Sequence, residues 1–499
     1  MHRVTAWQPA QGAGTAPGCS RRARLHLAVA LVVALAMGGC APEAPPRRPV
    51  LPVPSDWPAD AAAGLGLDAA PLAADLSWQA FFLDPRLRSL VETALVYNRD
   101  MRLAVLRVAE ARAAYDIRRA DQFPEFDLDA RGGRSRVPDD LNVTGQPVTA
   151  SNYGVFVGLA SWEIDLWGRV GSLKEAALQD YLGTDATRRA VRVSVIAAVA
   201  DAYLGLRELD ERIALAARTV RSRQESLRIF SRRYQVGATS KLDLTQVQTL
   251  LRQAQMLHAQ LTQSRAAQAH ALGLLLGAPE PPLSATALAP DDRALFHDLR
   301  AGLPADLLAD RPDIMAAEHA LRAARANIDA ARAAFFPRIA LTGEFGMASV
   351  QLSGLFDGAG RAWSFTPIIS LPIFDGGRRR ANLSLAQVRT DAAVANYEKA
   401  IQTAFRDVAN ALSARHWLTE QVAIQRAALD VQTERARLAQ LRYDSGAASY
   451  LEVLDAQRDL LDAQQGLVQV RRNLLASNVS LYAALGGGAQ NPIALTGRR

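Results

Sequence analysis

The feature that most constrains this chain is a segment that occurs twice. Residues 232–255 read RRYQVGATSKLDLTQVQTLLRQAQ, and residues 441–464 read LRYDSGAASYLEVLDAQRDLLDAQ. The two segments align around a glycine, Gly237 in the first and Gly446 in the second, which interrupts two runs of helix-forming residues. A repeat of this kind copies a whole supersecondary unit. The second half of the chain is therefore predicted to fold like the first.

The repeat extends upstream of these segments. Residues 112–130 match residues 325–343, including a Phe-Pro pair in each copy. The offset between the copies is 213 residues here and 209 residues at the glycine, so four residues are missing between them. Surface hairpin loops tolerate such deletions. The 499-residue chain is predicted to contain two copies of one unit, in the order helix, two strands, long helix, break, helix.

Long proline-free runs predict long helices. Residues 86–123 have apolar side chains at spacings of three and four, which predicts one helix that Pro124 ends. Residues 171–235 would form a helix on the order of 95 Å long, and a further helix is predicted over residues 241–276. No single globular core covers a helix of that length, so it needs other helices packed along it.

Two hairpins supply the β-structure. Apolar residues alternate with polar ones from Phe126 onward and again over residues 151–165. In the second copy, the same alternation occurs in the residues just before residue 343 and over residues 363–373. Strands of about ten residues have the length of transmembrane β-strands. Four strands cannot close a barrel, and an open sheet edge in lipid is costly. Several chains would therefore close one barrel together. The alternative is a soluble sheet in a periplasmic domain.

The N-terminus has the composition of an export signal. Residues 21–40 read RRARLHLAVALVVALAMGGC, with about a dozen apolar residues after the basic ones. That run is shorter than the ~20 residues of a membrane-spanning helix, which favours a secretory leader. Two glycines followed by Cys40 resemble a bacterial lipobox, whose cysteine carries lipid; the alternative is a weak anchor helix. The predicted divisions are a signal peptide over 1–39, a proline-rich lipid-anchored segment over 40–78, and repeats over 79–290 and 291–499.

Composition and motifs argue against several classes of function. The net charge of +7 falls to +3 without the four arginines that precede Cys40, and no basic run contains aromatic residues, so nucleic acid is not an expected partner. The sequence contains no Gly-x-Ser-x-Gly, no phosphate-binding Gly-x-x-x-x-Gly-Lys and no His-Glu-x-x-His. We therefore predict neither an enzyme nor a metal site, and no cofactor other than the covalent lipid on Cys40.

Several segments together identify a family. They are SWEIDLWGRV at 161–170, LPADLLADRPDI at 303–314, RANIDAARAAFFPRIALTG at 325–343, PIFDGGRRRANL at 372–383 and RYDSGAASYLEVLDAQR at 442–458. With them, the sequence resembles the TolC-like outer-membrane efflux proteins. It is most similar to the lipoprotein branch that serves resistance-nodulation-division (RND) pumps. The resemblance covers nearly all of the chain after Cys40.

The resemblance implies a fold that is mainly α with a small β part. Each internally duplicated chain would give four strands to a twelve-stranded transmembrane β-barrel, and a homotrimer would build a long periplasmic α-helical barrel below it. Gly237 and Gly446 would form helix-turn-helix tips at the periplasmic end and contact an adaptor protein. In members of this family a leucine and an aspartate close the aperture with help from an arginine, here matched by Leu451, Asp455 and Arg442. A plainer alternative is that Asp455 only pairs with Arg458 on a solvated helix face.

The implied function is a passive, gated exit duct in the outer membrane. An inner-membrane RND transporter would expel small molecules such as drugs through a periplasmic adaptor into this channel. Two alternatives are the exit channel of a type I protein-secretion system and a periplasmic coiled-coil lipoprotein without a pore. The resemblance does not name the transported substrate.

Overall fold

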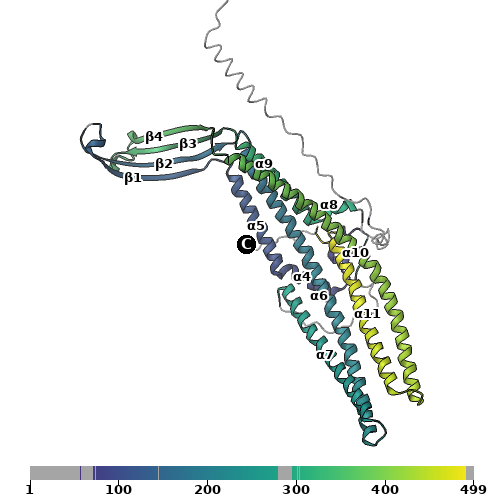
Figure 1. Cartoon of the computed structure of the whole chain (residues 1–499). Coiled ribbons are helices and arrows are strands. Elements are labelled where there is room, and N and C mark those ends of the chain that lie inside the picture. The colour runs from purple at the N-terminus through teal and green to yellow at the C-terminus, as the bar shows by residue number, and fades with distance from the viewer. Residues whose placement is uncertain are drawn as a thin grey trace, which may run out of the picture. The chain divides into compact units, whose positions relative to one another are not determined.

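The structure is a computed structural model of the protein. It describes residues 57, 71–73, 75–143, 145–278, 295–299, 302 and 304–489. These residues contain two copies of the predicted unit, and Figure 1 shows a four-stranded sheet joined to long helices. The fold is therefore mainly helical, as predicted. The first copy consists of helices α3 (Trp78–Phe81), α4 (Pro85–Tyr97), α5 (Arg99–Ala120), α6 (Arg169–Gln235) and α7 (Lys241–Leu276) with strands β1 (Phe126–Val137) and β2 (Val148–Ile164).

The second copy repeats the order of the long helices and strands, and its long helices have nearly the same lengths as those of the first copy. Its helices are α8 (Leu307–Asp310), α9 (Pro312–Ala333), α10 (Arg378–Asp444) and α11 (Tyr450–Ala484), and its strands are β3 (Arg338–Ser349) and β4 (Arg361–Ser370). Helices α6 and α10 each have 67 residues, or about 100 Å at the α-helical rise. Helix α6 packs against α5, α7, α9 and α11, and α10 packs against α9 and α11. The long helices thus have the neighbours that their length requires.

The four strands form one antiparallel sheet in the order β1-β2-β3-β4. Paired residues on neighbouring strands share a face of the sheet. One row across the sheet contains Leu128, Val157, Phe345 and Trp363, and another contains Leu159, Gly343 and Phe365. The large side chains on this face are mostly exposed, at 75% for Leu128 and 76% for Trp363. The face is apolar but carries no covering layer within the described part of the chain.

The prediction of one helix over residues 86–123 is wrong, because the chain breaks at Asn98 into α4 and α5. The buried Asn98 side chain caps α5 by accepting a hydrogen bond from the Met101 amide at 2.9 Å. Its Nδ2 also donates to the Leu275 carbonyl oxygen at 2.7 Å, in the last turn of α7. The end of α7 therefore abuts the start of α5, and one amide side chain satisfies backbone groups of both helices.

The second copy has the same joint, built with a different residue. The Arg311 guanidinium donates to the Ala484 carbonyl oxygen at 2.9 Å, where α11 ends and α9 begins. Asp313 at 2.6 Å and Asp407 at 3.5 Å neutralise this buried guanidinium. Close backbone packing accompanies both joints, since a Cβ on Gly277 would lie 2.2 Å from the Tyr97 oxygen and one on Gly486 would lie 2.6 Å from the Asp310 oxygen. Glycine is the residue that fits at each joint.

A cluster of aromatic side chains lies beside this second joint. The rings of Phe81 and Tyr482 stack at 4.2 Å, and Phe82 and Phe296 complete the aromatic cluster. The Tyr482 hydroxyl donates to the Leu76 carbonyl oxygen at 2.8 Å. Residues from the start and the end of the chain therefore hold one another in the same core. Within the described ranges, no helix has an apolar stretch long enough to cross a membrane.

Candidate functional site

The first tip joins α6 to α7 through residues 236–240. Gly237 adopts a left-handed conformation with φ 75°, and the Ala238 amide donates to the Arg233 carbonyl oxygen at 2.8 Å, which closes the end of α6. Ser240 and Asp243 then form a reciprocal capping box at the start of α7. Hydrogen bonds from Ser240 and from Thr239 hold the pKa of the Asp243 carboxyl below its ordinary value. Asp243 therefore stabilises the start of this helix.

The second tip joins α10 to α11 and has the same backbone geometry. Gly446 has φ 78°, and the Ala447 amide donates to the Arg442 carbonyl oxygen at 2.8 Å. Ser449 occupies the N-cap position of α11 but accepts no capping hydrogen bond through its side chain. The two predicted glycine turns are thus present and alike in backbone, while their side-chain caps differ.

The two tips contact each other within one chain. Phe230, Leu244 and Val247 of the first tip form a buried cluster with Leu454 of α11. The ring of Tyr450 lies 4.4 Å from that of Phe230, and its hydroxyl is 2.7 Å from the hydroxyl oxygen of Ser226. The first turn of α11 is therefore held against α6 by aromatic packing and a partly buried polar contact.

An arginine completes the contact between the tips. The Arg233 guanidinium donates to the Tyr443 hydroxyl, and its carbon lies 5.7 Å from the centres of the Phe230 and Tyr443 rings. Tyr443 in turn packs on Tyr450, with ring centres 4.9 Å apart. The predicted site contained none of these side chains. The available signal was the alignment itself, since Arg233 and Tyr443 both belong to the repeated Arg-Tyr pair.

The three predicted gate residues lie at the second tip. Leu451 is 48% exposed, in the first turn of α11. Asp455 is one turn further along and lies 3.5 Å from Arg458 in an ion pair whose side chains are about half exposed. Arg442 pairs with Glu452 at 2.8 Å. In the single chain the two charged residues thus have separate local partners, and Leu451 and Asp455 follow one another along the same helix.

A neighbouring carboxylate differs from Asp455 in its pairing. Asp459 lies 2.5 Å from Arg435 of α10 and 3.1 Å from Arg458. Arg435, and then Arg458, hold the pKa of the Asp459 carboxyl below its ordinary value. Asp459 therefore ties α10 to α11, whereas the ion pair of Asp455 stays within its own helix. Of the two, Asp455 is more available to a pore or to a neighbouring chain.

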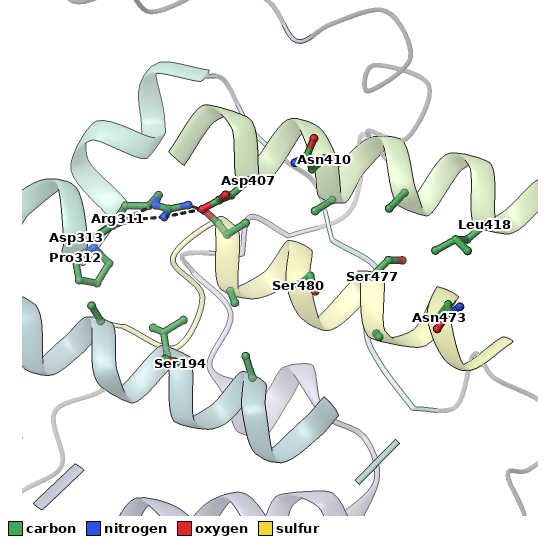
Figure 2. Close-up of a pocket in the computed structure, with 18 residues that line it drawn as sticks. Ser194, Arg311, Pro312, Asp313, Asp407, Asn410, Leu418, Asn473, Ser477 and Ser480 are labelled. Atoms are coloured by element: carbon green, nitrogen blue, oxygen red, sulfur yellow. Dashed lines mark hydrogen bonds and ion pairs between the residues drawn. The ribbon is translucent and has the colours of Figure 1, made fainter. Parts of the chain in front are cut away.

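A cavity of about 780 Å³ lies at the joint between α9 and α11. Figure 2 shows Arg311 with Asp313 and Asp407 at one end, Ser477 and Ser480 on α11, and Ser194 on α6. The rest of its lining is mainly alanine. Among the described residues, no group of three or more His, Cys, Asp or Glu side chains is arranged to hold a metal ion. The predicted lipid attachment residue, Cys40, lies outside the described residues.

Comparison with known proteins identifies the family. Residues 90–278 and 303–487 match the family described as outer membrane efflux protein. The chain belongs to this family. It is 43% identical to the outer membrane protein OprJ of Pseudomonas aeruginosa over 462 residues, which cover 92% of this chain and 95% of OprJ. It is also 43% identical to the toluene efflux pump outer membrane protein TtgI of Pseudomonas putida, over 91% of this chain and 96% of TtgI.

Solved structures agree with this assignment. The open state of the Neisseria gonorrhoeae MtrE outer membrane channel matches 90% of this chain and 99% of MtrE, with a TM-score of 0.79 and 36% identity. A membrane protein from Pseudomonas aeruginosa matches 90% of this chain and 100% of its own length, with a TM-score of 0.83 and 41% identity. The predicted family, fold class and outer-membrane efflux function are confirmed. This outer membrane efflux protein is a channel and not an enzyme.

Proposed function

We propose that three copies of this chain form the exit duct of a tripartite efflux pump. An inner-membrane RND transporter supplies the energy, and a periplasmic adaptor connects that transporter to this channel. The channel opens to the outside of the cell. The observation that carries the proposal is the match of both halves of the chain to the outer membrane efflux family. The relatives whose names mention an efflux pump favour such an assembly.

The sheet supports the trimer. Within the described residues, β1 and β4 each pair with one strand only, so both edges of the sheet are open. Open edges are very costly in lipid. Joining β1 of one copy to β4 of the next satisfies both edges, and three copies would give a closed wall of twelve strands. Apolar side chains exposed on the helices would be covered in the same assembly, among them Leu103, Leu106 and Ile117 of α5 and Ile424, Val431 and Leu438 of α10.

The helix tips are proposed to serve both docking and gating. The turns at Gly237 and Gly446 place two tips per chain at the adaptor end, and contact between them lets the pair move as a unit. Leu451 and Asp455 would each supply three side chains to the closed aperture, and Arg442 would hold the second tip through Glu452. A ring of carboxylates favours cations over anions.

The proposed cargo is small apolar compounds. Relatives that are 41–43% identical carry names that refer to toluene, solvents and antibiotics. The chain is further proposed to be anchored by a lipid on Cys40, after cleavage of residues 1–39. Such an anchor would hold each copy to the membrane in addition to its sheet.

Native mass spectrometry of the detergent-extracted protein tests assembly and anchor together. The expected species is a trimer of chains that begin at Cys40 and carry acyl mass, while Cys40→Ser should lose the acyl mass and keep the trimer. A monomeric wild-type protein would overturn the duct. A trimer without acyl mass would overturn only the anchor.

Conductance in planar bilayers tests the gate. We expect Asp455→Asn to lower cation selectivity and raise the resting conductance, because it removes three carboxylates from the aperture. Glu434→Gln is the matched control, since Glu434 is also an exposed acid paired with an arginine three residues later, Arg437, at 2.7 Å. Equal effects of the two substitutions would remove Asp455 from the gate.

A further inference from the structure

The arginines at the far end of the sheet divide between its two faces. Arg131 points to the polar face, where it pairs with Glu344 at 3.1 Å and with Asp129 at 3.7 Å. Arg134 and Arg136 belong to the other face, because they pair with Ser151 and Thr149 of β2. These two residues lie on the same face of β2 as Tyr153 and Val155, at alternate positions of the strand. Arg361 belongs to that face too, in one row with Ala130, Val155 and Met347.

The face that carries these three arginines is the exposed apolar one. On β4, Arg361 lies two residues before Trp363 in the sequence, on the side away from the helices. On β1, Arg134 and Arg136 come after Gly132, at which a Cβ would lie 3.5 Å from the ring of Tyr153. The apolar band from Phe126 to Gly132 spans about 20 Å at the rise of a strand. On its own strand each arginine therefore lies beyond the apolar residues, in the direction away from the helices (Figure 1), and Arg361 is level with Ala130 of β1.

These arginines have no protein partner that explains them. All three are exposed, and no ion pair joins any of them to a carboxylate of the described residues. The acids of the connecting loops, Asp139, Asp140 and Asp357, form no ion pair with them either. An exposed guanidinium next to an apolar surface is placed to reach an anion at the boundary between lipid and water, and phosphate is an anion that arginine binds through two parallel hydrogen bonds.

We propose that Arg134, Arg136 and Arg361 bind the phosphate groups of phosphorylated glycolipid in the outer leaflet of the outer membrane. This inference rests on the proposed position of the sheet in that membrane, with the helices on the periplasmic side. The apolar band contacts acyl chains, Tyr153 and Trp363 lie near its outer boundary, and the arginines lie where the headgroup phosphates are. In the trimer, β4 of one copy meets β1 of the next. The phosphate site therefore straddles each seam between copies and stabilises it.

Lipid retention by the full-length trimer tests this site. Wild-type protein in detergent is incubated with bisphosphorylated lipid A or with the same lipid after dephosphorylation, and bound lipid is counted by native mass spectrometry at increasing salt. We expect the triple variant R134Q/R136Q/R361Q to retain phosphorylated lipid A on the order of tenfold less well than wild type. Wild-type retention should fall with salt, and the dephosphorylated lipid should bind wild type no better than it binds the variant.

Two controls separate the possible failures. R221Q/R252Q/R426Q removes the same charge from exposed positions of the long helices and should retain lipid like wild type. Arg131→Gln changes the opposite face of the same strand and should also retain lipid like wild type. Equal retention by wild type and the arginine variant, or equal binding of the dephosphorylated lipid to wild type, would overturn the inference. Normal conductance in that case would leave the duct intact, whereas a wild-type protein that neither trimerises nor conducts would refute the duct itself.

Discussion

The Arg233 guanidinium at the first tip donates a hydrogen bond to the Tyr443 hydroxyl at the second tip. In the repeat, Arg233 is equivalent to Arg442, and Tyr443 is equivalent to Tyr234. The equivalent residues make other contacts: Arg442 pairs with Glu452, and Lys241 lies 5.3 Å from the centre of the Tyr234 ring. The repeat thus contains two identical Arg-Tyr pairs. Arg233 of the first pair contacts Tyr443 of the second, whereas the contacts of Arg442 and Tyr234 just given stay within their own tips.

We expect Tyr443→Phe to loosen the tips and raise the resting conductance of the channel. The substitution keeps the ring that packs on Tyr450 and removes only the acceptor of the Arg233 hydrogen bond. A double-mutant cycle with Arg233→Gln should give a coupling of about 1 kcal/mol in thermal unfolding. Tyr234→Phe is the control, because the Tyr234 contact uses the ring face and should survive. No coupling between Arg233 and Tyr443 would show that the tips are held by apolar packing alone.

The N-caps of the two tips provide a second matched pair. Ser240 accepts a hydrogen bond from the Asp243 amide at 3.0 Å, whereas the Ser449 side chain caps nothing. Ser240→Ala should therefore cost about 1 kcal/mol in the free energy of unfolding, and Ser449→Ala should cost much less. Differential scanning calorimetry of both variants measures the difference. A larger loss from Ser449→Ala would contradict the assignment of the caps.

Local signals predicted most of the fold. Proline-free runs predicted the extent of α6 and α7 closely, because a glycine, Gly237 or Gly277, follows each helix end within two residues. Alternation predicted four strands, and glycine between helical runs predicted both tips. Each of these features depends on residues close in sequence, so the sequence contains the information directly.

Features that depend on distant residues were not predicted. The break at Asn98 was missed, since an asparagine in an apolar-periodic run reads as an ordinary helix residue until the end of α7 is placed against it. The pairing of Arg233 with Tyr443, and of Arg311 with the end of α11, depends likewise on how long helices lie beside one another. The gate residues Leu451, Asp455 and Arg442 were predicted from the resemblance to the family. The structure of the single chain shows only the ion-pair partners of Asp455 and Arg442, which are Arg458 and Glu452.

The missed asparagine leads to a prediction of its own. Asn98→Ala should lower the free energy of unfolding by about 3 kcal/mol, because it removes the cap of α5 and leaves the Leu275 carbonyl without its donor in a buried joint. Asn142→Ala is the control: its Nδ2 donates to the Gln146 carbonyl oxygen at 2.7 Å, but in an exposed loop. Thermal unfolding in detergent compares the two. Similar losses would mean that the joint contributes no more than a surface turn.

The last prediction concerns acid and the contact between α9 and α6. His319 of α9 lies against Gly183 of α6, and its Nδ1 donates to the Gln179 side-chain oxygen at 2.7 Å. Burial, and then the nearby Arg322, lower the pKa of His319 from its ordinary value. Its contribution to stability is therefore complete above about pH 6.5, the ordinary histidine pKa, and is lost as the pH falls through the lowered pKa of the folded protein.

Acidification below pH 6.5 should thus weaken the packing of α9 on α6. We expect the thermal stability of wild type to fall between pH 7 and pH 5, and His319→Gln, which cannot gain a proton, to fall less over the same range. His258→Gln changes a histidine of α7, outside the contact between α9 and α6, and serves as the control for the loss of one imidazole. Calorimetry at closely spaced pH values gives the comparison. A His319→Gln profile parallel to that of wild type would assign the acid sensitivity to other groups.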